Sequence, residues 1–169
     1  MKYIRVLLKD GTKTRFTRTL TKDDVVGIVL GKGRIISLNI YNSIMFPNKG
    51  FLRDVMFLND IKEAEKDMGG IKNTSVLHQY KFLKNIKLKK NEYIPALGEL
   101  KMFIRRQNTI NYVRDQIGLS LIPIDFSLFW SSTLKNDLSP YGMTVAGKTY
   151  WGRCGVTKGY IAPFIKTKD

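Results

Sequence analysis

The stretch Phe129-Trp130-Ser131-Ser132-Thr133 decides the fold of this chain, and it follows the earlier stretch Tyr93-Ile94-Pro95-Ala96-Leu97-Gly98-Glu99-Leu100. Two large aromatic residues followed by three hydroxyl residues predict a β-strand whose tryptophan anchors a core. We expect Ser131, Ser132 and Thr133 to form hydrogen bonds with neighbouring backbone groups, because a buried hydroxyl group needs a hydrogen-bond partner. Trp130 and Ser132 are therefore expected in the structural core, and Trp130 is not expected to stack on a ligand sugar.

The earlier stretch predicts a helix that begins at a proline. Pro95 suits the first helical turn, because its missing N–H leaves no helical hydrogen bond unmade there. Leu97, Leu100 and Ile104 have the spacing of one buried helical stripe, and Glu99 lies near the positive end of the helix dipole. Pro95, Leu97 and Leu100 therefore complete the predicted structural core.

Paired strands are predicted at both ends of the chain. Residues 1–20 are expected to form an N-terminal β-hairpin arm, because Asp10-Gly11 separates two β-prone runs and suits a type I′ turn. This arm either closes the sheet or meets a neighbouring subunit, and residues 21–169 are expected to form one domain. A second hairpin joins 25–30 to 34–40 through Gly31-Lys32-Gly33. Further strands are expected over residues 128–132, 142–146, 149–154 and 160–166.

Three more helices are predicted from capping residues and apolar spacing. Asn59 or Asp60 caps a helix that runs to about Met68, where Gly69-Gly70 stops it. A second helix begins at Asn73 or Thr74 and ends near Asn85. A third begins at Asn108, buries Ile110, Val113 and Ile117, and ends at Gly118.

The order of these elements resembles a DUF1566-like group of C-type-lectin-like domains, which occurs in gut bacteria and their phages. The resemblance covers roughly residues 23–166 and implies an α+β fold of C-type-lectin-like type, with helices around a mostly antiparallel twisted sheet. In related folds the loops between late strands form the recognition surface, which here implies residues 134–141 and 150–157. The motifs that carry the resemblance are Val26-Gly27-Ile28-Val29, Asp67-Met68-Gly69-Gly70-Ile71-Lys72-Asn73-Thr74, Pro95-Ala96-Leu97-Gly98-Glu99-Leu100, residues 108–118, Trp130-Ser131-Ser132-Thr133 and Tyr160-Ile161-Ala162-Pro163.

The chain lacks the residues with which proteins of such folds bind calcium or catalyse formylglycine formation. Calcium-dependent sugar binding uses Glu-Pro-Asn or Gln-Pro-Asp triplets and a Trp-Asn-Asp strand, whereas Trp130 is followed by hydroxyl residues, which are poor calcium ligands. Formylglycine-generating enzymes share the fold but need a pair of active-site cysteines, and this chain has one cysteine. We therefore expect no metal site and no cofactor.

Composition excludes several further classes of protein. Cys154 and His78 are the single cysteine and histidine of the 169 residues, so neither an internal disulfide nor a Cys/His zinc site can form. No apolar run is long enough to span a membrane. Val6-Leu7-Leu8 is too short for a signal peptide, so we expect a protein made in a cytoplasm and not exported by that route.

A formal net charge of +15 favours negatively charged partners. The densest basic cluster is either a polyanion-binding patch or a solvated surface, and it consists of Lys81, Lys84, Lys87, Lys89 and Lys90. Tyr150 and Trp151 are neighbours in a predicted strand, so their rings point to opposite faces, and the sequence leaves open which is exposed. An exposed ring beside Arg153 suits a protein–protein interface.

These features predict a non-enzymatic structural or binding protein of a bacteriophage virion, such as a capsid decoration, head-fibre or tail-associated protein. Its expected partners are other virion proteins with acidic surfaces, with a second copy of the chain, a polyanion or a glycan as further possibilities. The alternative is a basic nucleic-acid-binding protein, which rests on charge alone because no known nucleic-acid-binding motif is present. No assembled nucleophile or base indicates an enzyme.

Overall fold

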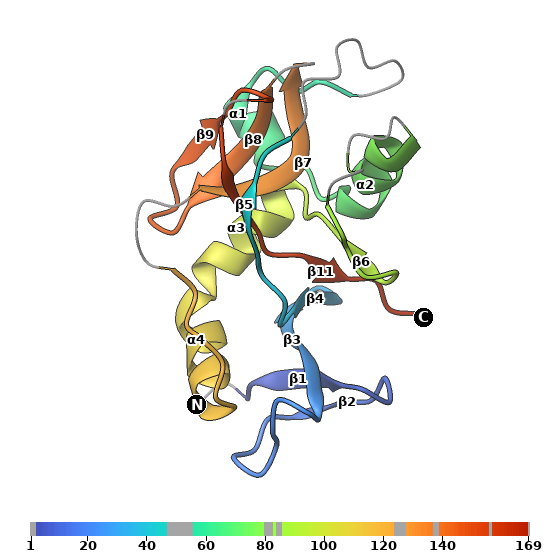
Figure 1. Cartoon of the computed structure of the whole chain (residues 1–169), viewed down its shortest axis with the longest axis vertical. Helices are drawn as coiled ribbons and strands as arrows, with labels where there is room; N and C mark the ends of the chain where they lie inside the picture. Colours follow the sequence, from blue (N-terminus) through green and yellow to red (C-terminus); the bar gives the residue numbers. More distant parts are fainter. Residues whose placement is uncertain are drawn as a thin grey trace.

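The computed structural model describes residues 3–46, 56–79, 83, 86–123, 128–136, 139–155 and 157–168. Two β-sheets occupy the two halves of the long axis in Figure 1, and helix α3 (Leu97–Arg105) passes between them. Most strand pairs are antiparallel. The fold is therefore mixed α+β, as the sequence predicts, but the strands are divided between two sheets where a single sheet was expected.

The first sheet contains both the earliest and the latest strands of the chain, and all its neighbouring pairs are antiparallel. Residues 1–20 are expected as a hairpin arm, and the described part of this segment, residues 3–20, closes one edge of this sheet, because β1 pairs with β3 and Val6 is fully buried. The order is β2-β1-β3-β4-β11-β6, with β1 (Arg5–Leu8), β2 (Lys13–Arg15), β3 (Val25–Gly31), β4 (Arg34–Ser37), β6 (Glu92–Tyr93) and β11 (Phe164–Ile165).

The N-terminal hairpin turns where Asp10-Gly11 predicts it, but the expected turn type is wrong. Gly11 has a φ of +88°, whereas Asp10 has no positive φ. The carbonyl of Leu8 accepts from the Gly11 N–H at 3.0 Å, and the Leu8 N–H donates to the Thr12 carbonyl at 2.9 Å. This is the longer hairpin loop that ends on a left-handed glycine. The type I′ pattern of two positive φ values instead occurs at Lys32-Gly33, between β3 and β4.

The second sheet has the order β5-β10-β7-β8-β9, and its β7–β10 pair is parallel. The single strand expected over 160–166 is in fact two strands in different sheets, separated at Ala162-Pro163, where the proline has no N–H to continue a ladder. The strands are β5 (Tyr41–Ile44), β7 (Leu128–Asn136), β8 (Ser139–Thr144), β9 (Thr149–Trp151) and β10 (Gly159–Ile161).

The helices begin near their predicted caps, with three corrections. Asp60 caps α1 (Ile61–Ala64) through the N–H groups of Lys62 and Glu63, but this helix is a single turn. Helix α2 (Gly70–Gln79) begins at Gly70, before the predicted cap at Asn73 or Thr74. Helix α4 (Gln107–Gln116) already includes Asn108, the residue expected to cap it.

Pro95 lies just before helix α3, because Ala96 is the extended residue at the helix start. Its expected place in the first turn is therefore wrong, although Pro95 is buried. The helix keeps its predicted buried face, since Leu97 and Leu100 are fully buried.

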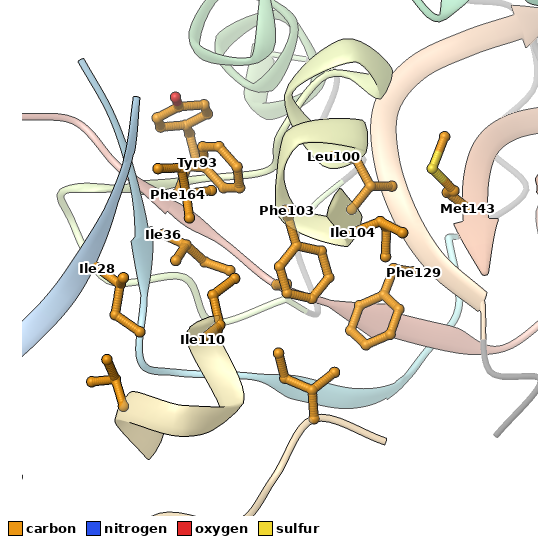
Figure 2. Close-up of a cluster of buried hydrophobic side chains, with 14 of the residues drawn as sticks. Ile28, Ile36, Tyr93, Leu100, Phe103, Ile104, Ile110, Phe129, Met143 and Phe164 are labelled. Carbon is orange, nitrogen blue, oxygen red and sulfur yellow. The ribbon is translucent and has the colours of Figure 1, made fainter. Parts of the chain in front are cut away.

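Helix α3 joins the two sheets into one hydrophobic core (Figure 2). The rings of Phe103 on α3 and Phe129 on β7 meet at 5.1 Å between centroids, with an interplanar angle of 64°. On the other side, Ile36 and Phe164 bring the first sheet into the same cluster. Burial of this much apolar surface is the main favourable term that holds the sheets together.

Trp130 anchors a second cluster on the far side of β7. Its side chain is fully buried, its Nε1 donates to the carbonyl of Ile44 at 3.0 Å, and its ring meets the edge of Phe46 at 5.5 Å. Gly152 and Gly159 pack directly on the indole, and a Cβ added to either would clash with it. Trp130 therefore lies in the core, where the sequence predicts it.

Two of the three hydroxyl residues after Trp130 attach β7 to the start of helix α3, and the third attaches it to β8. The Ser132 N–H donates to the Pro95 carbonyl at 2.8 Å, and the Leu97 N–H donates to Thr133 Oγ1 at 2.9 Å. Thr133 Oγ1 donates in turn to Asp67 at 2.7 Å, while Ser131 Oγ donates to the Tyr141 carbonyl at 2.8 Å. Strand and helix therefore belong to one scaffold.

Glu92 on β6 is a buried carboxylate that links the two sheets. It accepts hydrogen bonds from Ser37 at 2.7 Å, Asn39 at 2.6 Å and Tyr41 at 2.6 Å, and from the Lys89 N–H at 3.0 Å. Burial acts to raise the pKa of this carboxyl, but the hydrogen bonds outweigh burial and lower it below its ordinary value. The ionised carboxylate therefore stabilises the crossing from β4 to β5.

The first prediction concerns the two tryptophans, one buried and one exposed. We expect Trp130→Ala to lower the free energy of unfolding by about 3–5 kcal/mol, because it leaves a cavity beside Gly152 and Gly159. Trp151→Ala is the matched control and should change it by less than about 0.5 kcal/mol, because that side chain is half exposed. Urea denaturation followed by circular dichroism measures both, and equal losses for the two variants would contradict this assignment of the core.

The second prediction concerns Glu92→Gln, which replaces one carboxylate oxygen, the acceptor of two of the four hydrogen bonds, by an amide NH2 group and should cost about 1–3 kcal/mol near neutral pH. Because the pKa of Glu92 is lowered in the folded state, its carboxylate stabilises the fold at pH values above its unfolded-state pKa. This stabilisation is lost as the pH falls through the folded-state pKa. The difference between wild type and Glu92→Gln should therefore shrink between about pH 6 and about pH 3.

Urea titrations at several pH values measure this difference. Glu63→Gln is the control, because the Glu63 side chain is largely exposed and its ion pair with Lys66 lies at the surface, so its effect should stay within about 0.5 kcal/mol. A Glu92→Gln deficit that grew on acidification would show that the sign of the pKa shift is wrong.

Candidate binding site

Both aromatic side chains of strand β9 are exposed. Tyr150 is 47% exposed and Trp151 is 49% exposed, so the structure answers a question that the sequence left open. The strand lies at the edge of the second sheet and pairs with β8 alone among the described strands. Because both side chains are about half exposed, a ligand can reach both rings.

Trp151 lines a surface hollow of about 500 Å³, which we call the tryptophan hollow. It brings together the end of β7, the start of β8 and the segment that follows β9. These are the described parts of the two late-strand segments that the C-type-lectin resemblance implies as a recognition surface. The lining residues are Asn136, Ser139, Trp151, Gly152, Arg153 and Thr157.

The wall of the tryptophan hollow is fixed to the core by its backbone. The Gly152 N–H donates to the Pro140 carbonyl at 3.1 Å, and Gly152 itself packs on the Trp130 ring. Arg153 and Thr157 bond reciprocally, since the Arg153 N–H donates to Thr157 Oγ1 at 3.1 Å and the Thr157 N–H donates to the Arg153 carbonyl at 3.0 Å. The binding surface is thus preorganised, which lowers the entropic cost of binding.

Positive charge surrounds the exposed indole. The Nζ of Lys135 lies 3.7 Å from the centroid of the Trp151 ring, a cation–π contact that holds one side of the ring in place. Arg153 lines the same hollow and is exposed. No described lining residue is acidic. The site therefore suits a partner surface that offers carboxylates or aromatic groups.

The single cysteine and the single histidine of the chain lie outside this hollow. Cys154 is buried, and burial raises the pKa of its thiol to about 11, so the thiol stays protonated near neutral pH. His78 is exposed on α2. Within the described ranges, no three His, Cys, Asp or Glu residues gather closely enough to hold a metal ion. In the same ranges, no helix has the length and apolar character needed to cross a membrane.

Sequence reasoning did not anticipate that several carboxylates are buried with structural partners. Glu99 accepts from the Arg34 guanidinium at 2.6 Å, from the Ala96 N–H at 2.9 Å and from the Tyr93 hydroxyl at 3.1 Å. Burial raises the pKa of Glu99, while the Ala96 N–H and Arg34 oppose that shift. The available signal was its place three residues after the helix start, where a glutamate reaches back to the backbone.

The predicted lysine cluster does not join the tryptophan hollow. Lys81 and Lys84 lie outside the described residues, whereas Lys87, Lys89 and Lys90 are exposed just before β6. Lys89 lines a different surface hollow, together with Lys9 and Lys22 from the first sheet's side of the molecule. In Figure 1, β6 and β9 lie on opposite sides of the view. Trp151 and Arg153 therefore form one candidate site, and the lysines form another surface. Tyr150 is exposed on the same strand but lies outside the lining of the hollow.

Comparison with known proteins gives a match in structure alone. No protein-family model matches the chain, and no curated protein matches it either. The fold is similar to that of a fimbrial protein from Bacteroides ovatus, with a TM-score of 0.74 and 15% sequence identity. The match covers 99% of this chain and 49% of that protein, so the chain spans about half the length of its structural relative. The chain thus has the fold of part of a bacterial fimbrial protein.

Proposed function

We propose that this protein is a non-enzymatic binding module of a multi-protein assembly, which contacts a partner protein through Trp151 and Arg153. The observation that carries the proposal is the half-exposed Trp151 on an edge strand, beside a hollow whose wall is fixed to the core. Tryptophan, tyrosine and arginine are the residues most enriched among those that dominate protein–protein binding energy. A rigid surface that presents Trp151 beside Arg153 is suited to recognition.

We propose that the assembly is a bacteriophage virion, in which the protein is a capsid decoration, head-fibre or tail-associated component. A net charge of +15 supports contact with the acidic surface of another virion protein. The fold is also that of part of a fimbrial protein, which supports a structural role. A fimbria is therefore the second candidate assembly, and the shared fold is the observation that favours it.

The finer classification of the fold as C-type-lectin-like belongs to the same proposal. It is supported by the position of β1 and β11, which place both ends of the chain in the first sheet. It is also supported by the second sheet, where described residues of the two expected recognition segments meet at the tryptophan hollow.

A non-catalytic role is supported by the partners of the titratable groups. Glu92 and Glu99 are engaged by structural donors, and the Cys154 thiol is buried and protonated near neutral pH. A general base must reach a substrate proton directly or through one water. Neither carboxylate lines the tryptophan hollow.

Localisation tests the proposed assembly. Virions and surface filaments from the producing culture are purified separately by density gradient, and each fraction is examined by mass spectrometry. We expect the protein in virions at a constant ratio to the major capsid protein. Recovery with filaments alone would support the fimbrial candidate, whereas absence from both fractions would contradict an assembly role.

The third prediction concerns binding to the particle. Trp151→Ala should weaken binding to particles made without this protein by about thirtyfold, which corresponds to about 2 kcal/mol, because it removes a central aromatic contact. Cosedimentation of labelled protein over a concentration series measures the affinity. Ile71→Ala is the control, since Ile71 is 42% exposed on α2 and lines no part of the hollow. Unchanged binding of Trp151→Ala would remove this surface from the proposal.

A further inference from the structure

A second surface lies at the other end of the molecule, between the N-terminal hairpin and helix α4. Two adjoining hollows of about 680 and 260 Å³ share Tyr3, Ile4 and Thr109, and we call them together the arginine groove. In Figure 1, β1, β2 and α4 occupy the lower half, while β9 lies near the top. The four cations that line the groove are Arg5, Arg15, Arg18 and Arg106.

The arginine groove concentrates positive charge without internal compensation. Arg5 and Arg15 are direct cross-strand partners in the β1–β2 ladder, an arrangement of like charges that destabilises a sheet. None of the four arginines forms an ion pair with a described residue, whereas Arg34, Lys66 and Lys101 all do. An anion supplied from outside would therefore relieve the repulsion and gain several charge-assisted hydrogen bonds.

The described cations that line the arginine groove are all arginines. Lysines outnumber arginines in the chain, yet none of the described lysines lines either hollow. The guanidinium group presents a planar fork of donors that matches a carboxylate at two points, whereas an ammonium group acts as a point charge. The groove is thus built for defined anionic groups.

Aromatic side chains complete the groove. Tyr3 is 70% exposed and Tyr112 is 41% exposed, while Ile4 and Phe16 provide an apolar floor. The Arg15 guanidinium lies 4.1 Å from the centroid of the Tyr3 ring, and Phe16 meets Tyr112 edge-on at 6.3 Å. Charge and apolar contact area therefore lie side by side.

We propose that the arginine groove binds an acidic segment of a partner protein, with carboxylates on the arginine forks and an apolar side chain between Tyr3 and Tyr112. Arginine and tyrosine together are typical of protein–protein binding centres. Single-stranded nucleic acid instead follows a track of cations with open stacking rings, whereas here the Tyr3 ring already carries Arg15 on one face. This inference rests on the proposed role in an assembly and names the surface by which the module attaches.

A peptide-binding experiment tests the inference. The probe is a fluorescein-labelled peptide of about ten residues that alternates Asp or Glu with Leu, and its affinity for the full chain is measured by fluorescence anisotropy. The matched peptide carries Asn and Gln in place of the acids. We expect binding of the acidic peptide alone, and a loss of at least about tenfold in the double variant Arg15→Glu with Arg18→Glu.

The control variant has the same net charge as the groove variant. Lys62→Glu with Lys72→Glu changes two exposed lysines on α1 and α2, away from the groove, and should change peptide affinity by less than about threefold. Equal losses in the two double variants would overturn the proposal, because binding would then follow net charge alone. Stronger groove-dependent binding of oligo-dT than of the acidic peptide would also overturn it.

Two further variants show whether a loss of peptide binding comes from misfolding, from the tryptophan hollow or from the arginine groove. Arg15→Lys keeps the charge but loses the fork, so we expect several-fold weaker peptide binding and an unchanged melting temperature. Unchanged affinity in Arg15→Lys would contradict recognition by the fork. Trp151→Ala should bind the peptide like wild type, so a failure of the tryptophan hollow in particle binding stays distinct from a failure of the groove.

Discussion

The attachment of strand β7 to the start of helix α3 is the constraint on which the rest of the structure depends. The Ser132 N–H on β7 donates to the Pro95 carbonyl just before α3, and the Leu97 N–H of α3 donates to Thr133 Oγ1 on β7. Both donor residues are buried. Buried backbone donors are costly to leave unpaired, so the junction permits one register of strand against helix. That register places Trp130 against Gly152 and Gly159, and through them it sets the wall of the tryptophan hollow.

Features that depend on neighbouring residues were predictable from the sequence. The burial of Trp130, the buried face of α3 and the turn at Gly11 each follow from residues close together in the chain. Errors occurred where a distant contact overrides local preference. Helix α2 begins at Gly70, which packs against Ala96 and Glu99 at the start of helix α3, a contact that lies far away in the sequence.

The candidate sites also differ in whether they depend on neighbouring residues or on contacts between distant parts of the chain. Trp151 and Arg153 were recognisable because they are neighbours on one strand and its following segment. The arginine groove was not, because its cations come from β1, β2, the segment after β2 and the junction of α3 with α4. In the sequence those arginines resemble scattered charge. The pairing of β1 with β2 brings Arg5 and Arg15 together, and Arg18 and Arg106 join them at the contact between the N-terminal strands and the start of α4.

The separation of β10 from β11 at Ala162-Pro163 has a mechanical consequence. This short buried link runs directly from the sheet that carries the tryptophan hollow to the sheet that borders the arginine groove. Tension applied between the two ends of the molecule would therefore pass along covalent backbone as well as through side-chain packing. A module connected in this way can transmit a pulling force from a bound surface to its anchor while its two sheets stay together.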